Sequence, residues 1–478
     1  SISFIQNIFS QNPINIIESN KLEQIILNDT TFQKFSGNVI IEYTNFKIKC
    51  DTILIDEYRN HMRGWGNTHI FNDTLNCRSD SINIKEKLNQ MIFYKNSVLE
   101  TNDMKVDSDE IEYNFKTSEL AYFHGGKVQN KDSQIESVSF VHNMDKKYSK
   151  FKHNIHLKNM DYEIKSENME FHGDTVIFNG STVIQDADLL IRCIKGYLKH
   201  DEIIELHDGL EVNTKNQIIK ANYLKRNIKK DQNYFHKNVQ IQIDSSTYVF
   251  GDTLEQKNDI SVINGNCKIQ LNQNTEPTII TGEKIEIDKK NDILKVHNNI
   301  LISGDNLEGQ CQRIYFEKNY TQITMKKHPV LWLNEAQLTG ERIILNTIKN
   351  KLDSLEINDN PFIIYPNDSL EYHNQIKGKK LKGKFKNSQI EYISIVGNGE
   401  LKSFSIDKDN NDIISINDTQ ASNIRLVFEK NNIQKVVCFK NIEANNTEVN
   451  RSEVLNINQK NLYLKGFKLE SREKKDNF

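Results

Sequence analysis

Apolar and polar residues alternate along short runs that recur over most of the chain. In residues 46–50, with the sequence FKIKC, every second side chain is apolar, and after an interruption the apolar set resumes at Ile53 and Ile55. A period of two residues is typical of a β-strand that buries one face. The polar residues 56–60 then indicate a turn. The pattern predicts strands joined by short turns, and residues 18–27, the best candidate for a helix, fit a strand equally well.

The strand pattern restarts at intervals, and each restart has a recognisable opening. Gly37-Asn38 precedes a β-branched run, and Gly66-Asn67 opens the next unit. Because glycine and asparagine adopt positive φ at low cost, we interpret each opening as a tight β-turn. The spacing between openings is about 26 to 33 residues, which lies in the range of repeat architectures.

A second marker follows each opening by roughly half a repeat. It is a polar or small residue before an apolar one, as in Asp51-Thr52-Ile53, Asp80-Ser81-Ile82 and Asp252-Thr253-Leu254. Two markers that stay in phase along the chain predict a repeat of about 29 residues. The predicted fold class is therefore all-β, an elongated stack of antiparallel strands.

Length and composition support an elongated structure. A chain of 478 residues is too long for one compact core, and its hydrophobic content of 37% with a mean hydropathy of -0.63 is low for a globular protein of that size. Only five prolines occur, so the repeats run without proline-rich linkers. We expect a lead-in with a first strand at 1–31, repeats at 32–350, a C-terminal β region at 351–470 and a frayed tail at 471–478.

Charge, cysteine spacing and motifs exclude several classes of function. The net charge is -3, with 62 basic and 65 acidic residues well mixed, so no nucleic-acid surface is expected. The six cysteines lie singly, without the spacing of a metal site, and we expect small buried hydrophobes rather than disulfides. Motifs of nucleophilic, nucleotide-binding and zinc enzymes are absent from the sequence. We expect no enzyme, no cofactor and no metal.

Three polar stretches have a structural interpretation that is simpler than a functional one. His207-Asp208-Gly209 coincides with a repeat opening and is expected to be a turn. Residues 407–418 resemble a calcium loop, but Asp412 stands where that loop requires glycine, which favours a polar hairpin. The lysine-rich residues 377–386 could meet anionic lipid head groups, yet alternation favours a solvated or edge-protecting strand face.

The apolar positions are more informative. An antiparallel sheet with one apolar face must cover that face, so two such sheets extended by repetition enclose a long apolar interior. If side chains fill the interior, the protein is a structural rod; if the interior is open, it is a groove for acyl chains. The candidate lining residues are Val39, Ile41, Phe46, Ile48, Ile53, Ile55, Ile82, Ile84, Val176, Phe178, Ile241 and Ile243. Their facing rests on alternation, so an error of one residue would reverse it.

Several segments resemble the OstA-like family, whose best-known member is LptA. The resemblance is strongest to the long OstA-like proteins of Bacteroidetes, and it covers about residues 32–440. The matching segments are FSGNV at 35–39, CDTI at 50–53, GWGN at 64–67, AYFHGG at 121–126, IRCIKGY at 191–197, IKGKKLKG at 376–383, NG at 398–399 and SNIR at 422–425. Each motif is weak alone, while their order and spacing together are specific.

The resemblance implies a twisted β-jellyroll in the periplasm that binds the acyl chains of lipopolysaccharide. It also implies a bridge between inner- and outer-membrane complexes, and so a part in outer-membrane biogenesis. The implied partners are lipopolysaccharide, an LptC-type inner-membrane jellyroll and an LptD-type outer-membrane translocon, with head-to-tail self-association as a further possibility. Because this chain is much longer than LptA, one covalent chain would replace a self-assembled bridge.

Two other classes stay open from the residues alone. A structural or adhesive β-solenoid with a packed core would show the same periodicity, although the variable repeat length disfavours it. A carbohydrate-processing β-helix enzyme would need carboxylates clustered on one face, and the sequence contains no such cluster.

Overall fold

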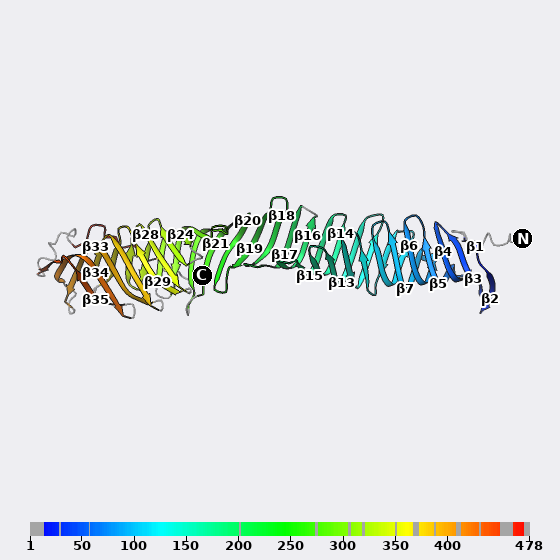
Figure 1. Cartoon of the computed structure of the whole chain (residues 1–478), viewed down its shortest axis with the longest axis horizontal. Helices are drawn as coiled ribbons and strands as arrows, with labels where there is room; N and C mark the ends of the chain where they lie inside the picture. The colour runs from blue at the N-terminus through cyan, green and yellow to red at the C-terminus, as the bar shows by residue number, and fades with distance from the viewer. Residues whose placement is uncertain are drawn as a thin grey trace. The chain divides into compact units, whose positions relative to one another are not determined.

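The computed structural model shows that the chain is built of antiparallel β-strands (Figure 1). It describes residues 14–27, 30–56, 58–199, 202–272, 276–304, 307–317, 321–348, 351–366, 372–386, 389–407, 413–429, 432–449 and 462–472. The chain divides into two compact units, Ser1–Lys230 (unit 1) and Asp231–Phe478 (unit 2). The predicted boundary between residues 350 and 351 lies inside unit 2. The predicted all-β stack of antiparallel strands is confirmed.

Unit 1 contains β1 to β18 and one 3-10 helix, Glu86–Leu88. Its strands are β1 Ile14–Glu18, β2 Lys21–Leu27, β3 Thr30–Tyr43, β4 Phe46–Asp56, β5 His61–Phe71, β6 Leu75–Lys85, β7 Gln90–Thr101, β8 Lys105–Asn114, β9 Glu119–Tyr122, β10 Gly126–Gln129, β11 Ser133–Ser137, β12 Ser139–Asn143, β13 Tyr148–Asn159, β14 Glu163–His172, β15 Thr175–Gln185, β16 Leu189–Lys199, β17 Ile203–Thr214 and β18 Ile218–Asn227. Most strands pair with their neighbours in sequence through short hairpins. The expected first strand is β1, and the ambiguous helix candidate is β2.

Unit 2 contains β19 to β36. Its strands are β19 Gln232–Gln242, β20 Thr247–Lys257, β21 Ile260–Leu271, β22 Thr278–Asp288, β23 Ile293–Ser303, β24 Leu307–Glu317, β25 Gln322–Lys326, β26 Val330–Leu333, β27 Ala336–Thr339, β28 Arg342–Ile348, β29 Lys351–Ile357, β30 Phe362–Pro366, β31 His373–Lys377, β32 Lys380–Lys386, β33 Gln389–Ile406, β34 Ile413–Glu429, β35 Asn432–Phe439 and β36 Glu443–Glu448. After β24 most strands are split, and their halves run in two layers. One layer, here called the front layer, pairs β26, β27, β30, β31 and the C-terminal half of β33; the other pairs β25, β28, β29, β32 and its N-terminal half.

A β-bulge bends each long strand near its middle. Ser36 pairs with Thr52 and Val39 with Cys50, so two residues of β3 oppose one residue of β4. The two residues are Gly37 and Asn38, both with positive φ. The predicted tight turn at this opening is therefore wrong: the pair bends a continuous strand, and the chain reverses instead at Thr44-Asn45 between β3 and β4. Both sites need positive φ, and sequence alone does not distinguish them.

The bulge also reverses the side-chain alternation. On β4, Ile48 and Cys50 are buried before the bulge, and Ile53 and Ile55 are buried after it. Without the extra residue, the second half of the strand would turn its apolar residues outward. Both halves of each bent strand therefore face the same interior, and the halves form its opposite walls.

The two sequence markers of the repeat are hydrogen-bond partners. Asn67 donates from its side-chain amide to the Asp51 carboxylate on the neighbouring strand, with 3.1 Å between Nδ2 and Oδ2. Asn266 donates to Asp252 in the same way at 3.0 Å. Further pairs are Asn96 with Asp80, Asn299 with Glu283, and Asn360 with Glu341. In these five pairs the asparagine at a bulge bonds the carboxylate one strand away, which explains why the two markers stay in phase there.

The lysine-rich segment lies within a sheet. Strand β32 pairs with β29 on one side and β33 on the other, so the interpretation as an edge-protecting strand is wrong. Lys380, Lys382 and Lys386 are exposed, while Leu381 and Phe385 are buried between them. The segment is thus a solvated face of an internal strand. Across the described ranges, no helix has the length and apolar content that a membrane crossing requires.

Candidate functional site

The apolar interior of unit 1 is the candidate site, and its walls come from both halves of the bent strands. Ile41 pairs with Ile48 across β3 and β4, and Ile48 pairs with Ile70 across β4 and β5. Ile82 and Ile84 lie beyond the bulge of β6, on the opposite wall, where they pair with Gly64 and Met62. All five isoleucine side chains are at most 2% exposed. The walls are therefore in contact with each other, and water does not reach them.

Most of the predicted lining residues are buried, and all of them except Ile241 and Ile243 of unit 2 belong to unit 1. Ten are buried: Val39, Ile41, Phe46, Ile48, Ile53, Ile55, Ile82, Ile84, Phe178 and Ile241. Val176 is half-buried because it lies near the hairpin end of β15, and Ile243 is half-buried because β19 ends at the residue before it. Their burial shows that these side chains are shielded from solvent, while their role in lipid binding stays a prediction.

Aromatic contacts close the interior along a line that we call the seam. Tyr43 lies at the hairpin between β3 and β4, and Phe115 lies at the hairpin that follows β8, at the opposite ends of the strands. Their rings nevertheless meet edge to face, with 6.0 Å between centroids. Phe46 and Tyr113 form a second such pair, also at 6.0 Å. The strands thus wrap until their opposite ends touch. Each aromatic pair contributes about 0.5–1.5 kcal/mol beyond its burial, so the seam is held by contacts that can separate.

A row of hydroxyl side chains inside the bulges was missed at the sequence level. Ser79, Ser108 and Ser166 are buried, and each lies on the last inward position before a bulge. Ser108 donates to the Gly125 carbonyl oxygen at 2.7 Å, and Ser166 contacts the Thr182 hydroxyl at 2.8 Å. A bulge leaves a backbone N–H or C=O group without its partner on the neighbouring strand, and the hydroxyl of a short side chain can hydrogen-bond to that group. The sequence signal is a serine or threonine immediately before the second marker.

The buried cysteines report on access to the interior. All six are free thiols; Cys50 and Cys311 are buried, whereas Cys438 is half-buried. Burial raises the pKa of Cys50 and of Cys311 to about 12, because the interior disfavours the thiolate. The expectation of small buried hydrophobes, rather than disulfides, is confirmed for five of the six.

We expect iodoacetamide at pH 8 to alkylate Cys438 at least tenfold faster than Cys50, because the thiolate is the reacting form and Cys50 is both shielded and protonated. Raising the pH should also destabilise the fold from about pH 8.5, the unfolded pKa, toward 12, since only unfolded thiols then lose their protons. Mass spectrometry of tryptic peptides over time measures the rates, and labelling in urea gives the unfolded reference. Equal rates for Cys50 and Cys438 would show an interior open to solvent.

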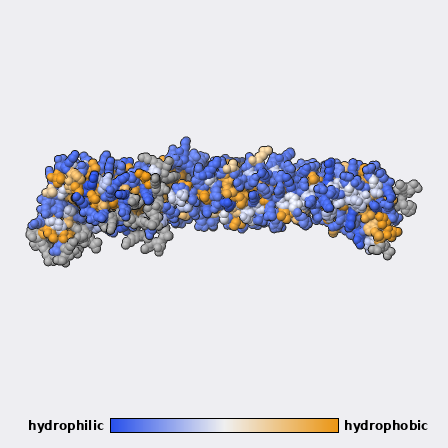
Figure 2. Space-filling model, turned by 60° about the horizontal axis from the view of Figure 1, so that its bottom comes forward, coloured by the Kyte–Doolittle hydropathy of each residue, from blue (hydrophilic) through white to orange (hydrophobic). Residues whose placement is uncertain are grey.

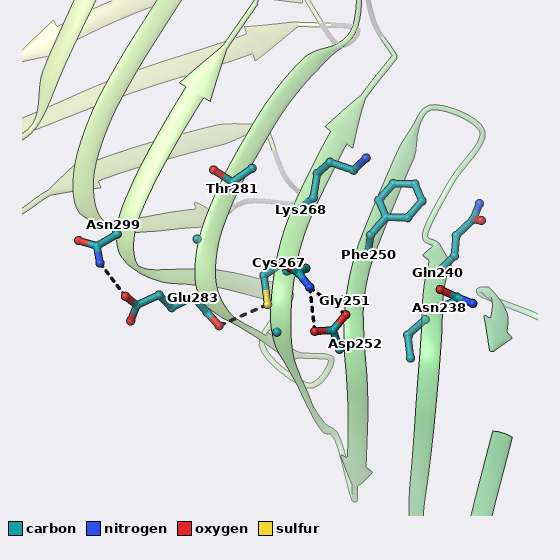
Figure 3. A pocket seen from close by; sticks show the side chains of 14 residues that line it. Asn238, Gln240, Phe250, Gly251, Asp252, Cys267, Lys268, Thr281, Glu283 and Asn299 are labelled. Carbon is teal, nitrogen blue, oxygen red and sulfur yellow. Dashed lines mark hydrogen bonds between the residues drawn. The ribbon is translucent and has the colours of Figure 1, made fainter. Parts of the chain in front are cut away.

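Unit 2 has a surface groove along the bulges of β19 to β23, with a volume of about 810 Å³ (Figure 3). Asp252 and Glu283 are its carboxylates, and asparagine amides bond both of them. The Lys268 ammonium lies over the Phe250 ring, 4.5 Å from the centroid. Because Asp252, Glu283 and Lys268 already have partners in the fold, we interpret the groove as a consequence of the bulge geometry.

The described residues contain no group of three or more histidine, cysteine or acidic side chains that could hold a metal ion. The calcium-loop resemblance at 407–418 depends on Asp409, Asn411 and Asp412, which lie outside the described residues. His207 and Asp208 lie at the bulge of β17, where the structure places strand rather than the expected turn. Asp208 has positive φ, which accounts for the turn-like sequence.

Comparison with known proteins gives a family match in the first part of the chain. No curated protein matches it. Residues 11–167 match the family described as OstA-like protein, over about a third of the chain. The matched residues include the interior wall from Val39 to Ile84 and the four aromatic residues of the seam. Residues 11–167 of this chain are therefore similar to the OstA-like proteins.

Proposed function

We propose that the chain binds the acyl chains of lipopolysaccharide in its interior and conveys this lipid through the periplasm from the inner to the outer membrane. The OstA-like match supports a lipid-transport structure. One observation carries the proposal to this chain: bent strands present aliphatic side chains from both halves to one interior, and aromatic pairs meet across its seam. Acyl chains could enter there while the sugar remains outside.

The mechanism is sequestration without chemistry. Removing acyl surface from water is favourable by about 25 cal/mol per Å², and the attraction has no preferred direction. A lipid could therefore slide from one repeat to the next without crossing a strongly bound state. Entry separates the two walls, so lipid contacts must replace the contacts between Ile41, Ile48 and the opposite wall. An upstream motor would supply the driving force.

The proposed docking end for an LptC-type jellyroll is the edge formed by β1 and β2. Both strands pair with β3, and β3 pairs with β4 on its other side. The segment Phe35–Ile41, an alternative docking strand, lies in β3 and so already has partners on both sides. Leu22, Ile26 and Leu27 of β2 are 51%, 70% and 60% exposed, and apolar surface gathers at this end in Figure 2. Strand addition by a partner would cover it. An LptD-type translocon or a second copy would meet unit 2.

A packed structural rod is the second candidate function. Its supporting observation is that Ile41, Ile48 and Ile53 are 0% exposed, as in a solid core. The two candidates differ in one property: whether lipid can separate the walls.

A photo-crosslinking residue at position 48 should capture lipopolysaccharide, and one at position 47 should not. Ile48 lies in the interior, whereas Lys47 is its half-buried neighbour on the outward side of β4. Purified full chain is irradiated with lipopolysaccharide, and adducts are detected by gel shift. Capture at neither position supports the rod, and capture at 47 alone would contradict the assigned facing.

Phe115→Ala should increase the rate of capture at position 48. The substitution removes one ring of the seam, and Phe115 is only half-buried, so the fold should persist. Phe123→Ala serves as control, because Phe123 is 45% exposed at the break between β9 and β10. An unchanged rate with Phe115→Ala would show that lipid does not enter through this seam.

A further inference from the structure

The C-terminal residues 462–472 lie across the front layer of unit 2, on the face opposite to its interior. Leu338 and Ile376 mark the interior face, and both are fully buried. The other face carries a row of directly opposed residues, here called the glutamine row. Its members are Glu308, Trp332, Gln337, Ile364, Gln375 and Lys402. The C-terminal segment contacts this row from Glu308 to Gln375.

Two buried glutamines of the row hold the backbone of the segment. Gln375 donates to the Leu462 carbonyl oxygen at 3.1 Å and accepts from the Leu464 N–H at 2.7 Å. Gln337 donates to the Lys468 carbonyl oxygen and accepts from the Glu470 N–H, both at 2.8 Å. Each amide thus bonds a carbonyl and an N–H two residues apart. This is the pattern that a parallel strand offers its neighbour, so the glutamines recognise extended backbone rather than particular side chains.

Side chains add apolar and charged contacts along the same path. Phe467 packs edge to face on Phe362 with 6.5 Å between centroids, and Tyr463 stacks on Phe467 at 4.2 Å. Leu462 packs on a small apolar cluster, Phe404, Ile413 and Ile416. At the far end, Arg472 Nε lies 2.6 Å from Glu308 Oε2.

The row is shielded from water while the segment lies on it. Gln337 and Gln375 are then 2% and 0% exposed, and the segment supplies the hydrogen-bond partners that buried amides require. The segment does not fill the available space: cavities of about 230 Å³ and 340 Å³ border it at Leu464 and at Lys468. The face is therefore shaped to receive an extended peptide and has room for larger side chains.

We propose that the glutamine row is a peptide-binding groove, that residues 462–472 are its resident ligand, and that an extended peptide of the same chemistry from another molecule can take their place. The ligand class is an extended segment with an apolar residue over the Phe404 cluster, an aromatic residue over Phe362 and a cation at Glu308. The groove is separate from the lipid interior, so the proposal does not depend on the proposed function.

The test uses the full chain with a site-specific protease sequence placed within residues 450–461. After cleavage, a fluorescent peptide of residues 462–472 should bind the cut chain one to one and exchange with the native fragment. The uncut chain should bind the peptide far more weakly, because its own segment occupies the groove. Gln337→Ala with Gln375→Ala should weaken binding about tenfold or more. Gln389→Ala, at an exposed glutamine of β33, should leave it unchanged.

A second measurement leaves the protein untouched. Peptides N-methylated at the positions of Leu464 and Glu470 lose the two N–H groups that donate to the glutamine oxygens. Their affinity should therefore fall by about tenfold or more. Equal binding of methylated and plain peptides, or no binding of the plain peptide, would overturn the proposal. So would a native fragment that never exchanges, because the segment would then be an integral part of the fold.

Discussion

Ile48→Asp is expected to lower the free energy of unfolding of unit 1 by about 3–5 kcal/mol, the range for an unpaired buried charge. Ile48 is 0% exposed and lies between Ile41 and Ile70 on the neighbouring strands. A carboxylate there must stay protonated or draw water between the walls. The same change should reduce lipid capture, since it places a polar group on the proposed path.

The two tryptophans allow the effect to be assigned to one unit. Trp65 lies in unit 1 and Trp332 in unit 2. In a Trp332→Phe background, urea unfolding followed by tryptophan fluorescence reports unit 1. Lys47→Asp, one residue away on the outward side, should change stability by less than about 0.5 kcal/mol. A similar loss for both variants would mean that Ile48 is not in a closed interior.

The strands were predictable because they depend on local alternation. Runs such as Phe46 to Cys50 bury every second residue in any sheet that has one covered face, and the structure places them so. The repeat was predictable as well, since asparagine and acidic markers recur in phase. Their physical link was not: Asn67 and Asp51 are 16 residues apart in sequence, and only the strand pairing brings them together.

The turns predicted at Gly37-Asn38 and at His207-Asp208 were wrong for one reason. Positive φ is needed in a turn and in a bulge, so Gly37-Asn38 carries the signal of both. Only the length of the flanking apolar runs, with alternation reversed at the pair, indicates a bulge. This reversal also explains why most predicted lining residues are buried on both sides of a bulge, as Ile48 and Ile53 are.

Contacts between segments that are far apart in the sequence could not be predicted from the local pattern of residues. The seam joins Tyr43 to Phe115 through the curvature that many bulges build up, and curvature cannot be read from one repeat. The C-terminal segment joins Gln375 to Leu464 over 89 residues. In the sequence, Gln375 stands between a polar and an apolar residue, as an exposed residue of any strand could. In the structure it is buried and bonds the backbone of that segment.

Gly66→Ala is expected to destabilise unit 1 by about 2–4 kcal/mol, combining left-handed backbone strain of about 1–2 kcal/mol with loss of a hydrogen bond. Gly66 has a φ of +79°, and an added Cβ would lie 2.3 Å from Asp51 Oδ2, the atom that accepts from Asn67. Gly173→Ala is the matched control: its φ is +62°, but no atom lies within 4 Å of the added Cβ, so it should cost only the strain of about 1–2 kcal/mol. Urea unfolding measures both. Adding Asp51→Ala to Gly66→Ala removes the clash, so the double variant should lose less than the sum of the single changes. If Gly66→Ala costs no more than Gly173→Ala, the carboxylate does not hold the bulge, and the coupling of the two repeat markers has another origin.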